Sequence, residues 1–128
     1  MAPPTIGSTF FEYDTSRLYI TYDGTNWVEK AEGHNVKGIG HGVMTVTTAG
    51  TDLVLAASTA AKVVIIQAQT DNTGVIAIGA SGVDATVATG TGIALYAGDS
   101  VVLEIDNLAD IFVDATVSGE GVRYTYLT

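Results

Sequence analysis

The chain has 128 residues, which is enough for one domain with its own core and a short appendage. Only 15% of the residues are charged, against roughly 25% in an average soluble domain, while 47% are apolar. Acidic residues outnumber basic ones by fourteen to five, and the basic ones are scattered, so we expect no nucleic-acid partner. The absence of cysteine excludes disulfides, thiolate nucleophiles and cysteine-based metal sites.

A surface built largely from Thr, Ser, Gly, Ala and Val is typical of a protein that is covered by copies of itself or by another surface. We therefore expect a homo-oligomer. No segment has the apolar length of a signal peptide or of a membrane span, so we expect a soluble product that is made in a cytoplasm and has no membrane partner.

Residues 1–30 are predicted to form an aromatic β-meander. Residues 8–14, 17–22 and 27–28 alternate aromatic or β-branched with polar residues, and turn-forming residues separate them. So small a sheet cannot bury large rings by itself. We expect its rings to form a contact surface, either on this chain's own domain or on a partner. The candidate partner-binding residues are Phe10, Phe11, Tyr13, Tyr19, Tyr22 and Trp27.

Residues 31–43 contain four glycines and no sustained period, which predicts a flexible linker or extended arm. Residues 44–128 consist of short β-type runs, separated at near-regular spacing by small turn residues. This pattern predicts an all-β fold, specifically a jelly-roll or Greek-key antiparallel sandwich.

Four runs allow finer predictions. Residues 52–62 come closest to a helical pattern and are assigned at most one turn of helix. Residues 62–70 read as a strand that is buried on both faces, with Val64 and Ile66 on one side and Val63 and Ile65 on the other. The strand at 100–106 is predicted to turn Val101, Leu103 and Ile105 inward. Val122, Tyr124 and Tyr126 are predicted to share one face of the last strand.

The stretch FFEYDTSRLYITYDGTNWVEK resembles a hairpin common in virion proteins of tailed bacteriophages, and residues 74–127 are similar to small phage structural β-domains. The resemblance implies a non-enzymatic capsid decoration protein, or cement protein, on the capsid exterior. Its partners would be the major capsid protein and copies of itself, as a homotrimer. The Gly-rich segment 33–42 belongs to neither pattern.

The chemical motifs are weak. A zinc or nickel site could be formed by His34 and His41 with Glu32 nearby, but the preferred interpretation is that both histidines are solvated loop residues. Asp106 and Asp110 flank Asn107 without the spacing of a calcium loop, so an Asx-capped turn is expected there. Glu104, Asp106, Asp110 and Asp114 are more typical of a solvated face than of a catalytic carboxylate pair. No catalytic residue, metal or cofactor is assigned.

Three functions remain open from the sequence. The first is capsid decoration, in which the protein bridges shell subunits. The second is a tail or fibre component, or another carbohydrate-binding β-sandwich, because tyrosine and tryptophan faces stack on sugars. The third is a jelly-roll enzyme with a metal on His34 and His41.

Overall fold

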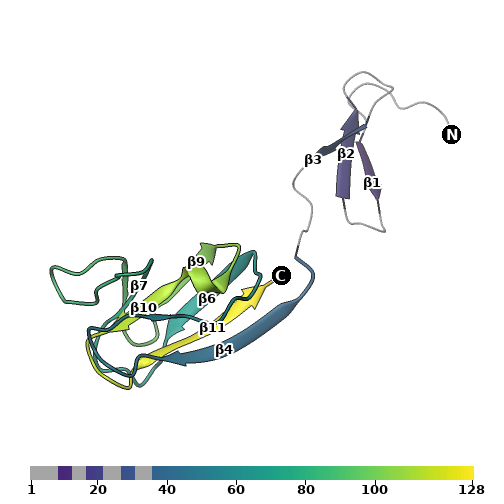
Figure 1. The fold of residues 1–128 in the computed structure, drawn as a ribbon. Helices are drawn as coiled ribbons and strands as arrows, with labels where there is room; N and C mark the ends of the chain where they lie inside the picture. Colours follow the sequence, from purple (N-terminus) through teal and green to yellow (C-terminus); the bar gives the residue numbers. More distant parts are fainter. Residues whose placement is uncertain (1–8, 13–16, 22–26, 31–35) are drawn as a thin grey trace. The chain divides into compact units, whose positions relative to one another are not determined.

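The computed structural model describes residues 9–12, 17–21, 27–30 and 36–128. The chain divides into two compact units, Met1–Val36 and Lys37–Thr128 (Figure 1). The N-terminal unit contains the expected meander, in which β1 (Thr9–Glu12), β2 (Arg17–Thr21) and β3 (Trp27–Lys30) form one antiparallel sheet in that order. The turns that were predicted between these strands lie outside the described residues.

The second unit, called the body below, contains eight strands. They are β4 (Ile39–Thr45), β5 (Leu53–Val54), β6 (Val63–Ala68), β7 (Ile76–Gly79), β8 (Ile93–Leu95), β9 (Ser100–Glu104), β10 (Phe112–Ala115) and β11 (Gly121–Leu127). A single 3-10 turn, η1 (Leu108–Asp110), lies between β9 and β10. Two four-stranded antiparallel sheets result, which we call the β4 sheet, with order β4–β11–β6–β9, and the β5 sheet, with order β5–β10–β7–β8.

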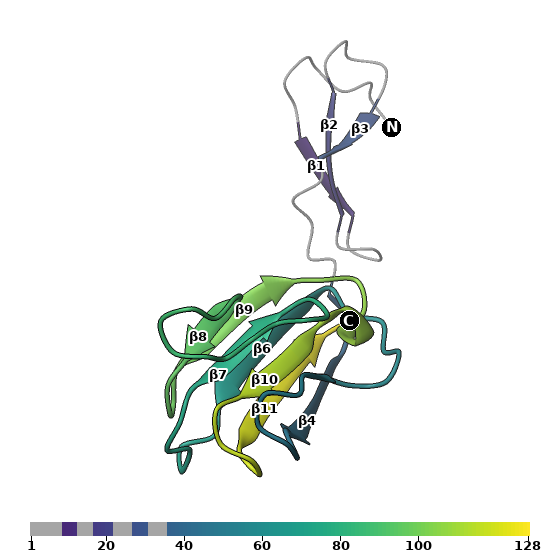
Figure 2. The ribbon, with the colours of Figure 1, turned by 60° about the vertical axis from the view of Figure 1, so that its left-hand side comes forward.

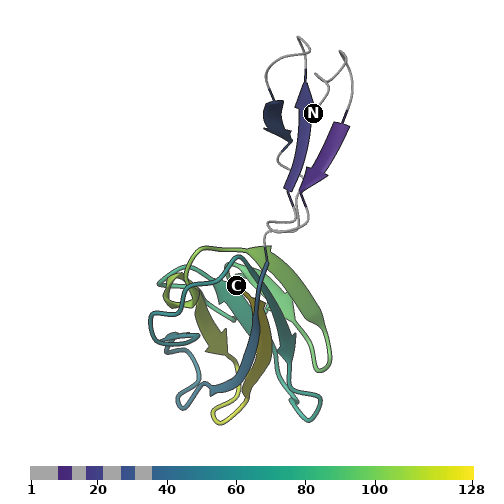
Figure 3. The same cartoon turned by 90° about the vertical axis from the view of Figure 1, so that its right-hand side faces the viewer.

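The strand order is that of a jelly roll. In the β4 sheet the first strand of the body pairs with the last, while in the β5 sheet the second pairs with the one before last. Apart from the β7–β8 connection, each connection between successive strands passes from one sheet to the other. Figures 2 and 3 show these strands from two further sides. The all-β sandwich predicted from the sequence is confirmed.

The core lies between the two sheets, where side chains alternate along each strand with period two. The β5 sheet contributes Ile76, Ile78 and Val113, and the β4 sheet contributes Val64, Ile66 and Val122. As predicted for the strand at 100–106, Val101, Leu103 and Ile105 pack against this core. Tyr124 and Tyr126 share the face of Val122, and their rings stack with centroids 6.3 Å apart.

The predicted linker 31–43 is wrong at its C-terminal end, because β4 begins at Ile39. Gly40 pairs with Tyr126 and Gly42 with Tyr124 across the sheet. A Cβ at Gly42 would lie 2.4 Å from Tyr124 Oη, and one at Gly40 would lie 2.3 Å from Tyr126 Cζ. The glycines are therefore strand residues whose missing side chains make room for two tyrosine rings.

Residues 52–62, to which at most one turn of helix was assigned, contain the short strand β5 and bends. Two other local predictions are wrong. Residues 82–88, one of the short β-type runs predicted within 44–128, belong instead to an irregular segment between β7 and β8. Ile65, assigned to a strand buried on both faces, is 39% exposed. Among the described residues, no helix has the length and hydropathy needed to cross a membrane.

Candidate functional site: the two outer faces of the sandwich

Each sheet has an inner face toward the core and an outer face, and the two outer faces differ. The outer face of the β5 sheet is covered by residues 80–92, which we call the covering loop. Val83 and Ala85 of this loop form a small buried cluster with Ala77 of β7, and Phe112 of β10 packs against it. The outer face of the β4 sheet has no such cover from the body, and four exposed large aliphatic side chains lie on it: Ile39, Val43, Ile65 and Val102.

A buried carboxylate holds the covering loop in place. Asp114 of β10 is 1% exposed, and its Oδ2 accepts a hydrogen bond of 2.8 Å from the Ala85 backbone N–H. Its other oxygen, Oδ1, is buried without a hydrogen-bond partner in the described part of the chain. Burying a polar group is costly unless it is hydrogen-bonded, so the bond to Ala85 is the feature that offsets part of this cost.

The covering loop also pairs with itself. Thr91 N–H donates to the Asp84 carbonyl oxygen at 2.8 Å, and Asp84 Oδ1 accepts from the hydroxyl of Thr86 at 2.6 Å and from its N–H at 2.9 Å. The Thr86 hydroxyl, and secondly the Thr86 N–H, lower the pKa of Asp84 because both bonds stabilise the ionised carboxylate. Polar groups of Asp84, Thr86 and Thr91 therefore make hydrogen bonds within the covering loop itself.

The outer face of the β4 sheet is a grid of side chains set by the strand register. One row across β4, β11, β6 and β9 consists of Ile39, Leu127, Val63 and Glu104. The next row consists of His41, Thr125, Ile65 and Val102, and a third of Val43, Arg123, Gln67 and Ser100. Ile39 is 74% exposed, Val43 67% and Val102 62%. Ile39 and Val43 lie in the edge strand β4, Val102 lies in the edge strand β9, and Ile65 of β6 lies between them at 39% exposed. Exposed apolar side chains that share one sheet face are typical of an interaction surface.

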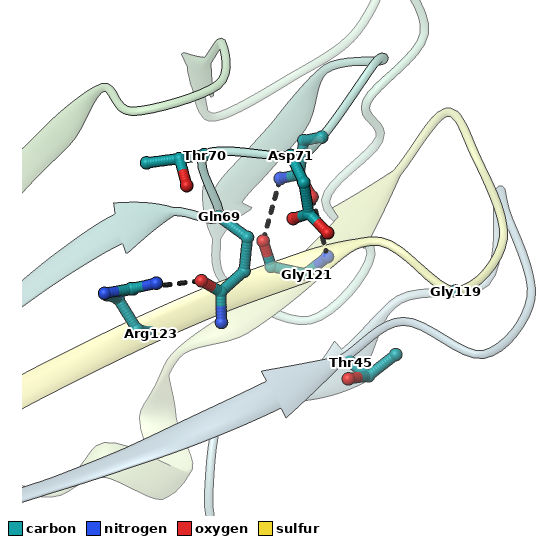
Figure 4. A pocket seen from close by; sticks show the side chains of 8 residues that line it. Thr45, Gln69, Thr70, Asp71, Gly119, Gly121 and Arg123 are labelled. Carbon is teal, nitrogen blue, oxygen red and sulfur yellow. Dashed lines mark hydrogen bonds between the residues drawn. The ribbon is translucent and has the colours of Figure 1, made fainter.

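A polar hollow of about 530 Å³ lies at the end of this face (Figure 4). Its lining comes from β4, from β11 and from the loop after β6, and includes Thr45, Gln69, Asp71 and Arg123. Arg123 Nε–H donates to Gln69 Oε1 at 2.9 Å, which holds the guanidinium group beside that loop. Asn72 is buried below and bonds the Gly121 carbonyl through Nδ2 at 2.9 Å. The hollow thus combines a cation with amide and hydroxyl groups.

Glu120 fastens the loop after β6 to the start of β11. Its Oε2 accepts from the Thr73 N–H at 2.5 Å, and its Oε1 accepts from the Gly74 N–H at 2.8 Å. The Thr73 N–H is the largest influence on Glu120 and lowers its pKa, while desolvation opposes this shift. This carboxylate therefore supports the shape of the hollow by holding its rim.

The sequence-predicted chemical sites are not assembled in the described residues. His41 is exposed on the outer face of the β4 sheet, and its proposed companions, His34 and Glu32, lie outside the described residues. Asn107 is the predicted cap: its Oδ1 accepts from Ala109 N–H at 2.9 Å and from Thr59 N–H at 3.0 Å. Glu104 is on the β4 sheet and Asp114 on the β5 sheet, so these two carboxylates are not a pair. No group of three or more potential metal ligands occurs among residues that the structure describes.

Four of the six predicted partner-binding rings lie in described strands of the N-terminal unit. Phe10 and Phe11 are in β1, Tyr19 is in β2 and Trp27 is in β3. The register sets Phe10 directly across from Tyr19, and Trp27 across from Thr21. Tyr13 and Tyr22 lie outside the described residues.

Sequence reasoning missed the outer face of the β4 sheet. Alternation within each strand was visible, but the exposed side chains Ile39, Ile65 and Val102 come from three strands whose pairing is not local in sequence. No signal in the sequence shows which face another part of the chain will cover. No protein-family model, no curated protein and no solved structure matches this chain.

Proposed function

We propose that this protein is a non-enzymatic structural component of a tailed-bacteriophage virion, which decorates the exterior of the capsid and stabilises it by bridging shell subunits. In this proposal the body associates with copies of itself, and the aromatic N-terminal meander contacts the major capsid protein. The protein is made in the host cytoplasm and functions on the assembled particle.

The observation that carries the proposal is the set of aliphatic side chains on the outer face of the β4 sheet that the rest of the body leaves exposed. Ile39, Val43 and Val102 would each be better placed in contact with a protein surface than in water, because burying apolar area stabilises association by about 25 cal/mol per Å². Jelly rolls recur in viral capsid proteins and in lectins, which is an analogy of fold and does not by itself assign a function.

Decoration works through many weak contacts. Several copies that engage several shell subunits multiply small affinities, since each further contact forms at high local concentration. A protein of this kind needs adhesive surfaces and a stable body, and the described residues supply an exposed sheet face on a two-sheet core. Low charge density at the adhesive face also fits this function, because charged residues are depleted from interface cores.

The experiment is binding to expanded capsids that lack this protein, followed by heating with and without it. We expect co-sedimentation with the capsids and a higher temperature of shell disruption when the protein is bound. Trp27→Ala and Tyr22→Ala are expected to weaken attachment by about 2–4 kcal/mol, as truncation of aromatic anchors does, while the body stays folded. Absence of binding together with unchanged heat resistance would exclude decoration.

Carbohydrate binding is the alternative that the same material can test. In the body, Tyr124 and Tyr126 pack against the core, while Tyr96 is exposed. A glycan array with the full chain separates the two functions. Signal on a sugar that Tyr96→Ala abolishes would favour the alternative, and a blank array together with capsid binding would favour decoration.

A further inference from the structure

We propose that the outer face of the β4 sheet binds the same face of a second copy of this chain, across a twofold axis that passes beside Ile65. This inference rests on the proposed function only in taking self-association to be part of how the protein works. The resemblance to phage proteins implies a homotrimer, whereas this inference assigns the outer face of the β4 sheet to a twofold contact between two copies.

The first argument is the charge pattern of the face. Arg123 in β11 and Glu104 in β9 are the only charged residues, histidine aside, within the four strands of the β4 sheet. Every other carboxylate of the body lies outside these strands: Asp52, Asp71, Asp84, Asp99, Asp106, Asp110, Asp114 and Glu120. Copies with a net negative charge repel one another least where each presents one positive and one negative group.

The second argument is where these two charges lie. Arg123 is across from Gln67, one strand and two residues from Ile65. Glu104 is across from Val63. It is also displaced from Ile65 by one strand and two residues, but in the directions opposite to those of Arg123, so Ile65 lies midway between the two charges. A twofold axis in the plane of the contact, perpendicular to the line between these two charges, places each Arg123 over the partner's Glu104. The face is self-complementary, as an isologous contact requires.

The apolar residues complete the same arrangement. Ile65 lies on the axis and meets its copy, and Ile39, two strands away, lies on the same diagonal of the grid. β-branched side chains from two such faces interdigitate when sheets stack about 10 Å apart. Arg123 is already held by Gln69 through Nε, so less side-chain entropy is lost when its remaining donors meet a carboxylate.

The size of the face sets the strength of the contact. Four strands spaced about 4.8 Å apart and three rows of side chains give a face on the order of 400 Å² in projection. A standard stable interface buries about 800 Å² per partner. We therefore expect a dimer that dissociates in the micromolar-to-millimolar range in solution and forms more completely on a particle, where copies are concentrated.

The test is a charge-swap series on the full chain, measured by sedimentation equilibrium from about 10 μM to about 1 mM. Arg123→Glu sets two carboxylates against each other at both symmetry-related positions, and Glu104→Arg does the same with two cations. We expect each single change to weaken dimerisation by about 10-fold or more, and the double swap to restore it to within about 3-fold of the unchanged chain.

The matched control is Asp110→Arg, an exposed carboxylate of η1, which changes the net charge as Glu104→Arg does but lies off the face. We expect it to leave the dimer unweakened. Circular dichroism and thermal melting of every variant establish that the body is folded, and a variant that fails this check is replaced by Arg123→Gln or Glu104→Gln, for which a smaller weakening is expected.

Three results would overturn the inference. They are a chain that stays monomeric up to about 1 mM, a mass three times the 13.2 kDa of one chain, or a double swap as weak as the single changes. Capsid binding is measured separately with the same variants. If the chain binds capsids but the double swap does not restore dimerisation, the twofold contact is refuted and the proposed function stands. If the chain forms the dimer with rescue by the double swap but does not bind capsids, the proposed function is refuted and the twofold contact stands.

Discussion

The outer faces of the two sheets differ in whether another part of the body covers them. Residues 80–92 fold over the β5 sheet, where Val83 and Ala85 bury Ala77 and the Ala85 N–H bonds Asp114. The β4 sheet receives no such loop within the body, and Ile39, Val43 and Val102 stay exposed. The body thus covers the outer face of one sheet and leaves the outer face of the other exposed.

The largest expected effect comes from making the same change on both faces. Val83→Asp places a carboxylate in a buried cluster next to the buried Asp114, and we expect it to lower the free energy of unfolding by about 3 kcal/mol or more. Val102→Asp, on the exposed face, is expected to cost no more than about 1 kcal/mol, mainly through the poor strand preference of aspartate. Urea denaturation measures both, and equal losses would mean that the two faces do not differ as described.

The tyrosines that lie over glycines on the inner side of the β4 sheet provide the next test. We expect Gly42→Ala to destabilise the body by about 2 kcal/mol, because its Cβ would collide with the Tyr124 ring. In a Tyr124→Ala background the ring is gone, so the same change is expected to cost less than about 0.5 kcal/mol. If Gly42→Ala costs the same in both backgrounds, the glycine is there for another reason.

The bond between Asp114 and the covering loop is expected to have a smaller effect. Asp114→Ala leaves the Ala85 N–H without its acceptor, and we expect a loss of about 1 kcal/mol, since removal of the buried, half-satisfied carboxylate offsets part of the cost. Asp114→Asn retains a carbonyl acceptor and serves as the matched control. Hydrogen exchange gives the local measurement: the Ala85 amide should exchange faster in the alanine variant than in the asparagine variant.

The smallest effect concerns the rim of the hollow beside the β4 sheet. Because the Thr73 N–H lowers the pKa of Glu120, its ionised form contributes stability above the ordinary glutamate pKa of 4.5, and this contribution is lost as the pH falls through the lower folded value. We expect Glu120→Gln to flatten the fall in melting temperature between about pH 5 and pH 3. Asp71→Asn, an exposed carboxylate of the same hollow, is the control, and an identical change in both variants would argue against a special position of Glu120.

Much of the fold could be predicted from the sequence, because the alternation of side chains along a strand depends only on neighbouring residues. The inward faces of residues 100–106 and of Val122, Tyr124 and Tyr126 follow from period-two alternation alone, and the structure confirms them. Gly40 and Gly42 were misread as linker residues because the reason for them lies in β11, far along the chain. Ile65 was misread because its neighbours on the outer face come from β9 and β11.

The candidate site was less accessible than the fold. The six rings of the N-terminal unit were visible as a cluster in the sequence, and the strand register sets Phe10 across from Tyr19. The outer face of the β4 sheet and its charges at Arg123 and Glu104 needed the strand register. Asp114 was read as part of a solvated acidic edge, whereas the covering loop makes it a buried acceptor.

By itself, the sequence determined that this chain folds from strands, because alternation and turn chemistry act over a few neighbouring residues. Only the tertiary structure decided which strand faces are buried, since that depends on pairing between distant segments and on where the covering loop lies. The exposed outer face of the β4 sheet arises from that pairing, because each of its four strands supplies only three of the side chains that lie together there.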